Sequence, residues 1–241
     1  MSEASSSVGV SAGANPSGQP VTPAVVEHAR VRTAVEIDRR AVILRNPLSA
    51  RAASFRMLRH RLADRGDPKV VLVTSANDGE GKTTCALNLA WALAESGRNR
   101  VLLLEANTAR PGMAALLGFL PPGCFLEQLV QYRAAPARAW TVARGPHDLD
   151  VLAVHQGPEP HPPMHGPSLM AAIASLRAAY DYIVIDTSSI LTGLDVPLLQ
   201  DMADGIVIAA RARQTRGRAL HAALGQAGVS RVLGVVLMDS G

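Results

Sequence analysis

Residues 70–84 read Val-Val-Leu-Val-Thr-Ser-Ala-Asn-Asp-Gly-Glu-Gly-Lys-Thr-Thr. The first six residues are a mostly apolar run of the kind that forms a strand buried on both faces. Residues 76–83 fit a spacing in which a small residue and four residues of any type precede Gly-Lys-Thr. Residues 83–96 then show helical spacing, which ends at Gly97. A strand, a glycine-rich turn and a helix in this order predict a phosphate-binding loop, and a chance turn is the weaker alternative.

Each residue type in this loop has a physical role in holding phosphate. Gly79 and Gly81 let the backbone curl so that successive N–H groups point at phosphate oxygens. The helix N-terminus adds the positive end of its dipole. Lys82 supplies a point charge, and the Thr83 hydroxyl can ligate Mg²⁺. We therefore expect ATP and Mg²⁺ as cofactors. The candidate ATP-binding residues are Ala76, Asn77, Asp78, Gly79, Glu80, Gly81, Lys82, Thr83 and Thr84.

The rest of the chain repeats the alternation of strand and helix. Predicted strands lie at residues 101–104, 149–154, 182–186, 205–209 and 232–238, and predicted helices at 47–65, 125–132, 168–179 and 215–227. Such alternation is typical of an α/β fold with a mostly parallel, doubly wound sheet covered on both faces. The fold class expected is that of a P-loop NTPase.

Composition limits the other classes of protein. Of the 241 residues 48% are hydrophobic and only 3% aromatic, so the core must be aliphatic. No apolar stretch is long enough to span a membrane, no signal peptide is evident, and two distant cysteines form no disulfide framework. We expect a cytoplasmic protein with a disordered tail and linker at residues 1–45 and an ATP-binding domain at 46–241.

The positive charge is concentrated near the N-terminus. The chain carries a net charge of +4, whereas residues 27–65 alone hold ten arginines and four acidic residues. This segment could meet an anionic membrane, an acidic partner or a neighbouring subunit. Nucleic acid is not an expected partner, because no aromatic residues are interleaved for base stacking.

A carboxylate follows the predicted strand at residues 182–185. Asp186 would lie at the carboxyl edge of a parallel sheet, where ligands bind in open α/β folds. Beside a phosphate loop, such an aspartate is expected to hold the water shell of Mg²⁺. The alternative, an ordinary turn residue after a strand, is less probable in this context.

A further motif gives the family. Residues 101–111 read Val-Leu-Leu-Leu-Glu-Ala-Asn-Thr-Ala-Arg-Pro. They resemble the second acidic motif of the bacterial tyrosine kinases of the CpsD/CapB kind, which carry a deviant Walker A loop. That motif is an apolar run, Asp-x-Asp, two residues and Arg-Pro. Here Glu105 and Asn107 replace the two aspartates. The resemblance implies Lys82, Glu105 and Asp186 as catalytic residues and Thr83, Glu105 and Asp186 as metal ligands.

The resemblance covers roughly residues 45–238 and implies partners as well. Arg56 and Arg59 match a Glu-x-x-Arg-x-x-Arg motif that builds ring-shaped homo-oligomers, but Ala53 stands at the glutamate position and should weaken that contact. The family also implies a membrane-anchored polysaccharide co-polymerase, or chain length regulator, as activator. The protein would then be peripheral at the inner membrane. The chain stops at Gly241 without the tyrosine-rich tail usual in the family.

Three functions follow from these patterns. The first is a protein-tyrosine kinase, with full or attenuated catalysis, that transfers phosphoryl groups from ATP and regulates exopolysaccharide or capsule synthesis and export. The second is an ATP-binding adaptor with weak catalysis that docks on the co-polymerase. The third is a ParA/MinD-type ATPase. Those ATPases carry a second lysine near the start of the phosphate loop, and Asn77 stands at that position here, which disfavours this function.

Other polar residues give weaker signals. His155, His161 and His165 lie close in sequence, but a Pro-rich loop does not aim them at one metal ion. Cys85 is expected to be a packing residue. Arg211 could contact the nucleotide or be solvated.

Overall fold

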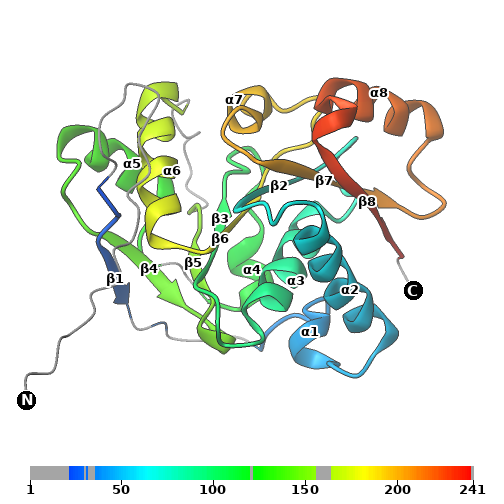
Figure 1. Cartoon of the computed structure of the whole chain (residues 1–241), viewed down its shortest axis with the longest axis horizontal. Helices are drawn as coiled ribbons and strands as arrows, with labels where there is room; N and C mark the ends of the chain where they lie inside the picture. The colour runs from blue at the N-terminus through cyan, green and yellow to red at the C-terminus, as the bar shows by residue number, and fades with distance from the viewer. Residues whose placement is uncertain (1–21, 30, 32–35, 120–121, 156–163, 240–241) are drawn as a thin grey trace, which may run out of the picture.

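The computed structural model describes residues 22–29, 31, 36–119, 122–155 and 164–239 (Figure 1). The strands are β1 (Val26–Ala29), β2 (Val70–Ser75), β3 (Val101–Glu105), β4 (Trp140–Arg144), β5 (Asp150–Leu152), β6 (Tyr182–Asp186), β7 (Gly205–Arg211) and β8 (Val232–Met238). The helices are α1 (Val42–Arg45), α2 (Ala50–Asp64), α3 (Lys82–Ala94), α4 (Met113–Leu117), α5 (Phe125–Ala134), α6 (Gly166–Ala179), α7 (Val196–Gln200) and α8 (Gly217–Ala227).

All eight strands join one sheet in the order β1-β4-β5-β3-β6-β2-β7-β8. Every neighbouring pair is parallel except β4 and β5, which are antiparallel. The strand β2 lies between β6 and β7, so the loop that follows it opens at the carboxyl edge of the central strands. The predicted fold class is confirmed.

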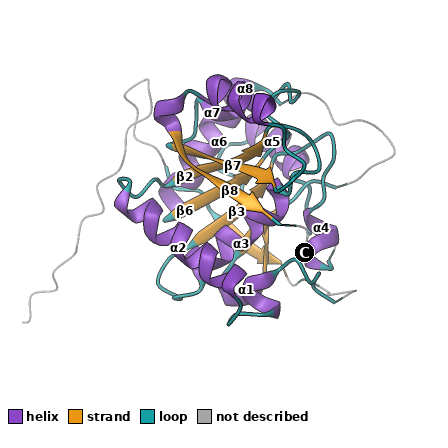
Figure 2. Cartoon of the chain, turned by 90° about the vertical axis from the view of Figure 1, so that its right-hand side faces the viewer, coloured by secondary structure: helices purple, strands orange, loops and turns teal. Residues whose placement is uncertain are grey.

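Helices cover both faces of the sheet, as Figures 1 and 2 show. The apolar residues alternate along each central strand, so that Val70 and Leu72 pack in one core and Val71 and Val73 in the other. Helices α5 to α8 cover the first core, and α1 to α4 cover the second. A strand buried on both faces must be apolar at every position, which explains the continuous apolar runs in the sequence.

The N-terminal boundary differs from the sequence prediction. Strand β1 pairs with β4, and α1 packs its Ile43 into the second core, so the folded part begins before residue 46. These short elements have mixed polarity and give little periodic signal. The predicted disorder of residues 1–21 lies outside the described residues.

A buried carboxylate joins β1 and β4 to the body of the sheet. Asp150 is 4% exposed and accepts hydrogen bonds from the Tyr180 hydroxyl at 2.8 Å and from Arg144 Nε at 3.1 Å. His28 Nε2 of β1 lies 2.9 Å from the same carboxylate. A second tyrosine, Tyr182, donates to Asp67. Both tyrosines are therefore structural.

We predict that Asp150→Ala lowers the free energy of unfolding by about 2–4 kcal/mol, because it leaves the Tyr180 hydroxyl and Arg144 without their acceptor. Thermal unfolding should show a drop of roughly 5–10 °C. The control is Asp148→Asn, since Asp148 is 80% exposed, its contact with Arg144 is long at 3.7 Å, and asparagine tolerates its φ of +54°. Equal stabilities of the two variants would contradict this role for Asp150.

Candidate functional site

The loop between β2 and α3 has the backbone that phosphate binding needs. Gly79 and Gly81 adopt φ of +79° and +94°, which favours glycine, and Gly81 is the N-cap of α3. A Cβ on Gly81 would lie 3.1 Å from Met238 Cγ, so the Met238 side chain leaves little room for another residue type there. The loop and the first turn of α3 thus present backbone N–H groups at the carboxyl edge of the sheet.

A cavity of about 1190 Å³ opens over this loop. All seven residues from Asp78 to Thr84 line it, together with Arg110 and Arg211. Its opposite wall comes from the N-terminal segment, through Asp38, Arg39, Arg40, Val42, Arg45, Asn46, Ser49 and Arg51. The predicted ATP-binding residues therefore converge on one cavity, with two exceptions. Ala76 is buried at the end of β2, and Asn77 bonds to Glu80 through its N–H and its amide, at 2.9 and 3.0 Å.

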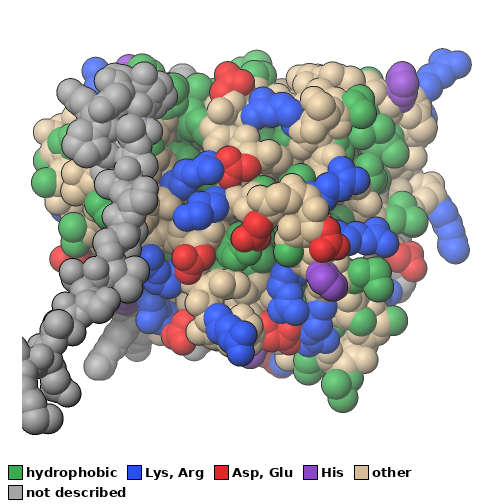
Figure 3. Space-filling model, in the orientation of Figure 1, with side chains coloured by type: hydrophobic (Ala, Val, Ile, Leu, Met, Phe, Trp, Pro, Cys, Tyr) green, Lys and Arg blue, Asp and Glu red, His purple; other side chains and the backbone are tan. Residues whose placement is uncertain are grey.

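Sequence reasoning missed the contribution of residues 38–51 to this cavity. It assigned their positive charge to an anionic membrane, an acidic partner or a neighbouring subunit, whereas four of the arginines line the same cavity as the phosphate loop. Asn88 of α3 holds this wall in place, because its side chain bonds to the Arg40 carbonyl at 2.8 Å and accepts from Ile43 N–H at 3.2 Å. On the face that Figure 3 shows, basic and acidic side chains are interspersed rather than gathered into one basic patch.

Charged groups at the loop pair with one another. Lys82 Nζ lies 3.2 Å from Asp78 Oδ1, and Arg110 Nη1 lies 3.4 Å from Asp78 Oδ2. Burial acts to raise the pKa of Asp78, but Lys82, Ser189 and Arg110 outweigh it and lower the pKa below its ordinary value. The Lys82 side chain is only 8% exposed. The Asp78 carboxylate thus satisfies the two cations that would otherwise face a phosphate.

Asp186 is a buried carboxylate without a hydrogen-bond partner among the described residues. It ends β6, where its Cα is opposite Val73 of β2 and Glu105 of β3. Burial, with the charge of Glu105, raises the pKa of Asp186 to about 8, while Thr83 and Lys82 act in the opposite direction. Asp186, like Glu105, does not line the cavity, but its two oxygens are unpartnered among the described residues and lie near the hydroxyl of Thr83, which does line it. Such oxygens suit a hard divalent cation. The residues present therefore fit Mg²⁺.

Glu105 does not reach the cavity. The side chain is fully buried, and its carboxylate accepts from the N–H groups of Gly112, Met113 and Val154 at 2.6, 2.9 and 3.0 Å. Burial raises the pKa of Glu105, against the opposing effect of these three donors. The predicted role of Glu105 as metal ligand and acid–base residue finds no support in this geometry. Among the described residues, each hydrogen bond that its carboxylate accepts comes from a backbone N–H group.

Asn107 is also used within the chain. Its amide donates to the Arg110 carbonyl at 2.9 Å, and its Oδ1 accepts from Arg110 N–H at 3.3 Å and from Ser188 Oγ at 3.1 Å. The side chain closes the turn at residues 107–110. Arg211 donates to the Gly79 carbonyl at 2.9 Å, so it supports the phosphate loop while lining the cavity.

The arginines of the predicted oligomer motif make contacts inside the chain. Arg56 forms a two-pronged ion pair with Glu95, with Nε–Oε2 at 2.7 Å and Nη2–Oε1 at 2.5 Å. Arg59 donates to the Ala92 carbonyl at 2.8 Å. These bonds dock α2 on α3. A ring contact weakened by Ala53 stays a prediction.

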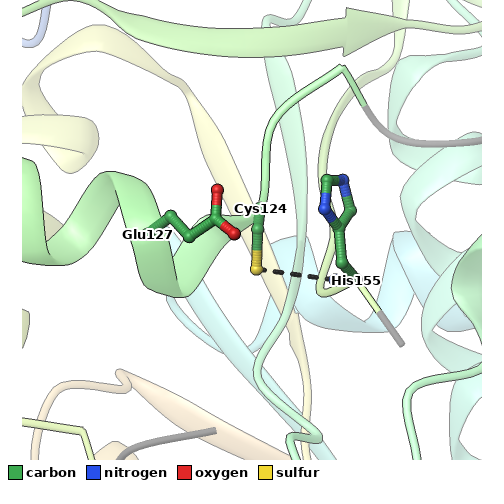
Figure 4. A group of neighbouring side chains, drawn as sticks. All are labelled: Cys124, Glu127 and His155. Carbon is green, nitrogen blue, oxygen red and sulfur yellow. Dashed lines mark hydrogen bonds between the residues drawn. The ribbon is translucent and has the colours of Figure 1, made fainter. Parts of the chain in front are cut away.

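The three histidines do not form a cluster within the described residues. His165 caps α6, with its Nδ1 2.8 Å from Ser168 Oγ, and His161 lies outside the described part. His155 lies beside Cys124 and Glu127, with ligand atoms within 4.8 Å of one another (Figure 4). The backbone N–H of His155 donates to Cys124 Sγ, with 3.5 Å between nitrogen and sulfur. Cys85 is fully buried on α3, as its packing role predicts.

Comparison with known proteins identifies the family, although no family model matches the chain. The tyrosine-protein kinase YwqD of Bacillus subtilis is 32% identical over 179 residues, which are 71% of this chain and 73% of YwqD. The chain belongs to the bacterial tyrosine kinases. A second relative of this kinase family, the succinoglycan biosynthesis transport protein ExoP of Rhizobium meliloti, is 28% identical over 205 residues. The match spans 81% of this chain but only 26% of ExoP.

Solved structures share the fold. The chimerical protein CapA2B2 superposes with a TM-score of 0.71 at 21% identity, over 93% of this chain and 95% of that one. A ParA family ATPase from Chlorobium tepidum gives a TM-score of 0.57 at 17% identity over 71% of this chain and 72% of that one, so it shares the fold. The assignment to the kinases rather than to the ParA/MinD ATPases rests on the sequence relatives.

We predict that Asp186→Asn stabilises the kinase in the absence of Mg²⁺ by on the order of 1–3 kcal/mol, because it removes a buried carboxylate that lacks a partner. The pKa of Asp186 is raised in the folded state to about 8. The neutral carboxyl group therefore contributes to the free energy of unfolding at low pH, and this contribution is lost as the pH rises through about 8.

Thermal unfolding between about pH 5 and pH 9 measures this effect. The increase in the free energy of unfolding caused by Asp186→Asn should grow as the pH rises toward about 8. Added Mg²⁺ with ATP should stabilise the wild type more than the variant. A gain that shrinks as the pH rises would contradict the raised pKa.

Proposed function

We propose that the chain binds ATP with Mg²⁺ and transfers the terminal phosphoryl group to a tyrosine hydroxyl, as a regulator of exopolysaccharide or capsule synthesis and export. The observation that carries the proposal is the pairing of a complete phosphate loop with the unpartnered carboxylate of Asp186. Membership of the bacterial tyrosine kinases supports the choice of reaction.

The chain's own residues would bind and orient the nucleotide. Lys82 would leave Asp78 and neutralise the outer phosphates, while the loop N–H groups hold their oxygens. Thr83 and Asp186 would hold Mg²⁺, which supplies charge for the phosphoryl oxygens when bound. Arg110 is 75% exposed beside the phosphate loop and would keep its ion pair with Asp78. Catalysis of this kind is mostly positioning and electrostatic stabilisation.

An ATP-binding adaptor is the second candidate function, and one observation favours it. Glu105 and Asn107 stand at the positions of the family's catalytic aspartates, and both form hydrogen bonds to the backbone. Glu105 accepts from the first residue of α4, and Asn107 donates to the carbonyl of Arg110 within the turn of residues 107–110. In that case nucleotide binding would set the affinity for a partner, with little phosphoryl transfer.

The partner proposed in both cases is a membrane-anchored polysaccharide co-polymerase. The likeness to one quarter of ExoP, a transport protein of succinoglycan biosynthesis, supports this choice. Among the described residues, no helix is long and apolar enough to cross a bilayer. We propose that the chain reaches the inner membrane through that partner.

The two lysines of the chain provide a matched test. Lys82→Ala should reduce transfer from labelled Mg-ATP to a tyrosine-containing acceptor by about 100-fold or more, because the charge on the outer phosphates is lost. Lys69→Ala is the control, since Lys69 is exposed at the start of β2 and outside the cavity.

The assay includes the cytoplasmic segment of the co-polymerase. Transfer by the wild type and the control, but not by Lys82→Ala, would establish a kinase. A wild type that binds Mg-ATP and transfers nothing would refute the kinase and leave the adaptor as the better account.

A further inference from the structure

A smaller cavity of about 240 Å³ lies beside the nucleotide cavity. Asp78, Asn107 and Arg110 line both cavities, so the two meet at the phosphate loop. Two segments form the walls of the smaller cavity. One is the turn at residues 107–110, and the other is the segment between β6 and α7, which contributes Ser188, Thr192, Gly193, Leu194 and Asp195. A cavity of this size has room for one side chain rather than for a nucleotide.

The shape of this second cavity depends on Gly193. A Cβ there would lie 2.6 Å from Ser188 Cβ, 2.8 Å from Val196 Cγ2 and 2.9 Å from the Ser189 carbonyl. Any larger residue would force the segment open. Ser188 donates to Asn107 at 3.1 Å, which fixes the opposite wall against it. Both walls are therefore held by contacts within the chain.

Among the described residues, two acidic residues line the second cavity, and their carboxylates differ in how many partners they have. Asp78 is committed to Lys82 and Arg110. The carboxylate of Asp195 has one hydrogen bond among the described residues, a long one of 3.4 Å from the Thr108 hydroxyl. Asp195 is half-buried at the start of α7, where its side chain caps no helical N–H. It is the carboxylate at this cavity that is available to accept a proton.

We propose that the second cavity receives the tyrosyl side chain of the acceptor and that Asp195 is the catalytic residue that takes up its hydroxyl proton. This inference rests on the proposed kinase function. In the step, the phenolic O–H proton passes to the Asp195 carboxylate and the phenolic oxygen forms a bond to the terminal phosphorus of ATP. The bond from that phosphorus to the bridging oxygen breaks, and ADP leaves with the electron pair.

This assignment accounts for the two substitutions in the second acidic motif. Glu105 is fully buried away from both cavities, and Asn107 has no charge with which to accept a proton. Asp195 and Asn107 line the same cavity, and the Asp195 carboxylate lies 3.4 Å from the hydroxyl of Thr108, the residue after Asn107. The base is thereby supplied from the segment between β6 and α7 rather than from the end of β3.

The test compares Asp195→Asn with Asp201→Asn, whose carboxylate is 81% exposed at the other end of α7. Asp195→Asn should lower kcat for transfer to a synthetic tyrosine-containing peptide by about 100-fold or more. Its Kd for Mg-ATP should stay within about two-fold of the wild type, and its melting temperature within about 2 °C. Asp195→Glu should restore part of the activity, and Asp201→Asn should behave as the wild type.

The possible failures are distinguishable. Undiminished transfer by Asp195→Asn, in a wild type that is active, would overturn the role of Asp195 alone. A loss of transfer matched by an equal loss of Mg-ATP binding or of thermal stability, and not recovered in Asp195→Glu, would also overturn it. A wild type that binds Mg-ATP but phosphorylates no peptide would overturn the kinase function, and this inference with it.

Discussion

The burial of α3 fixes the phosphate loop. Every side chain from Cys85 to Ala94 is at most 1% exposed, and the helix packs on β2, β3, β6 and β7. A helix enclosed to this extent cannot rotate or slide without opening cavities in the second core. Its first turn is therefore held against the carboxyl ends of the central strands. The conformation of Gly79 and Gly81, the burial of Lys82 and the place of Asp186 all follow from that constraint.

The same helix ties the nucleotide cavity to the N-terminal segment. Asn88 holds the wall at Arg40 and Ile43, and Arg56 and Arg59 bind the C-terminal end of α3. The cavity thus has a rigid floor and a wall attached through a few polar bonds. Positive charge from that wall adds to the loop, which is the electrostatic setting that a polyphosphate needs.

The central part of the fold could be predicted because its signals are local. Continuous apolar runs mark β2, β3, β6 and β7, and the loop motif places Lys82 and Asp186 at one edge. Strands β1 and β4 could not be predicted, since both are short and have mixed polarity. The edge strand β1 also depends on the contact between His28 and Asp150, which lie 122 residues apart in sequence. The direction of the Glu105 side chain was equally out of reach. Its partners are backbone groups at residues 112, 113 and 154, and only the tertiary structure brings them together.

The central claim is that the nucleotide site is complete while Glu105 supports backbone. The most direct test is the Glu105→Gln variant, studied by thermal unfolding and by titration with Mg-ATP. The amide places an N–H₂ group against backbone N–H donors, so we expect a loss of about 1–3 kcal/mol in stability and a Kd for Mg-ATP within about two-fold of the wild type. Unchanged stability with an affinity for Mg-ATP that falls about ten-fold or more would make Glu105 a metal ligand and contradict the account.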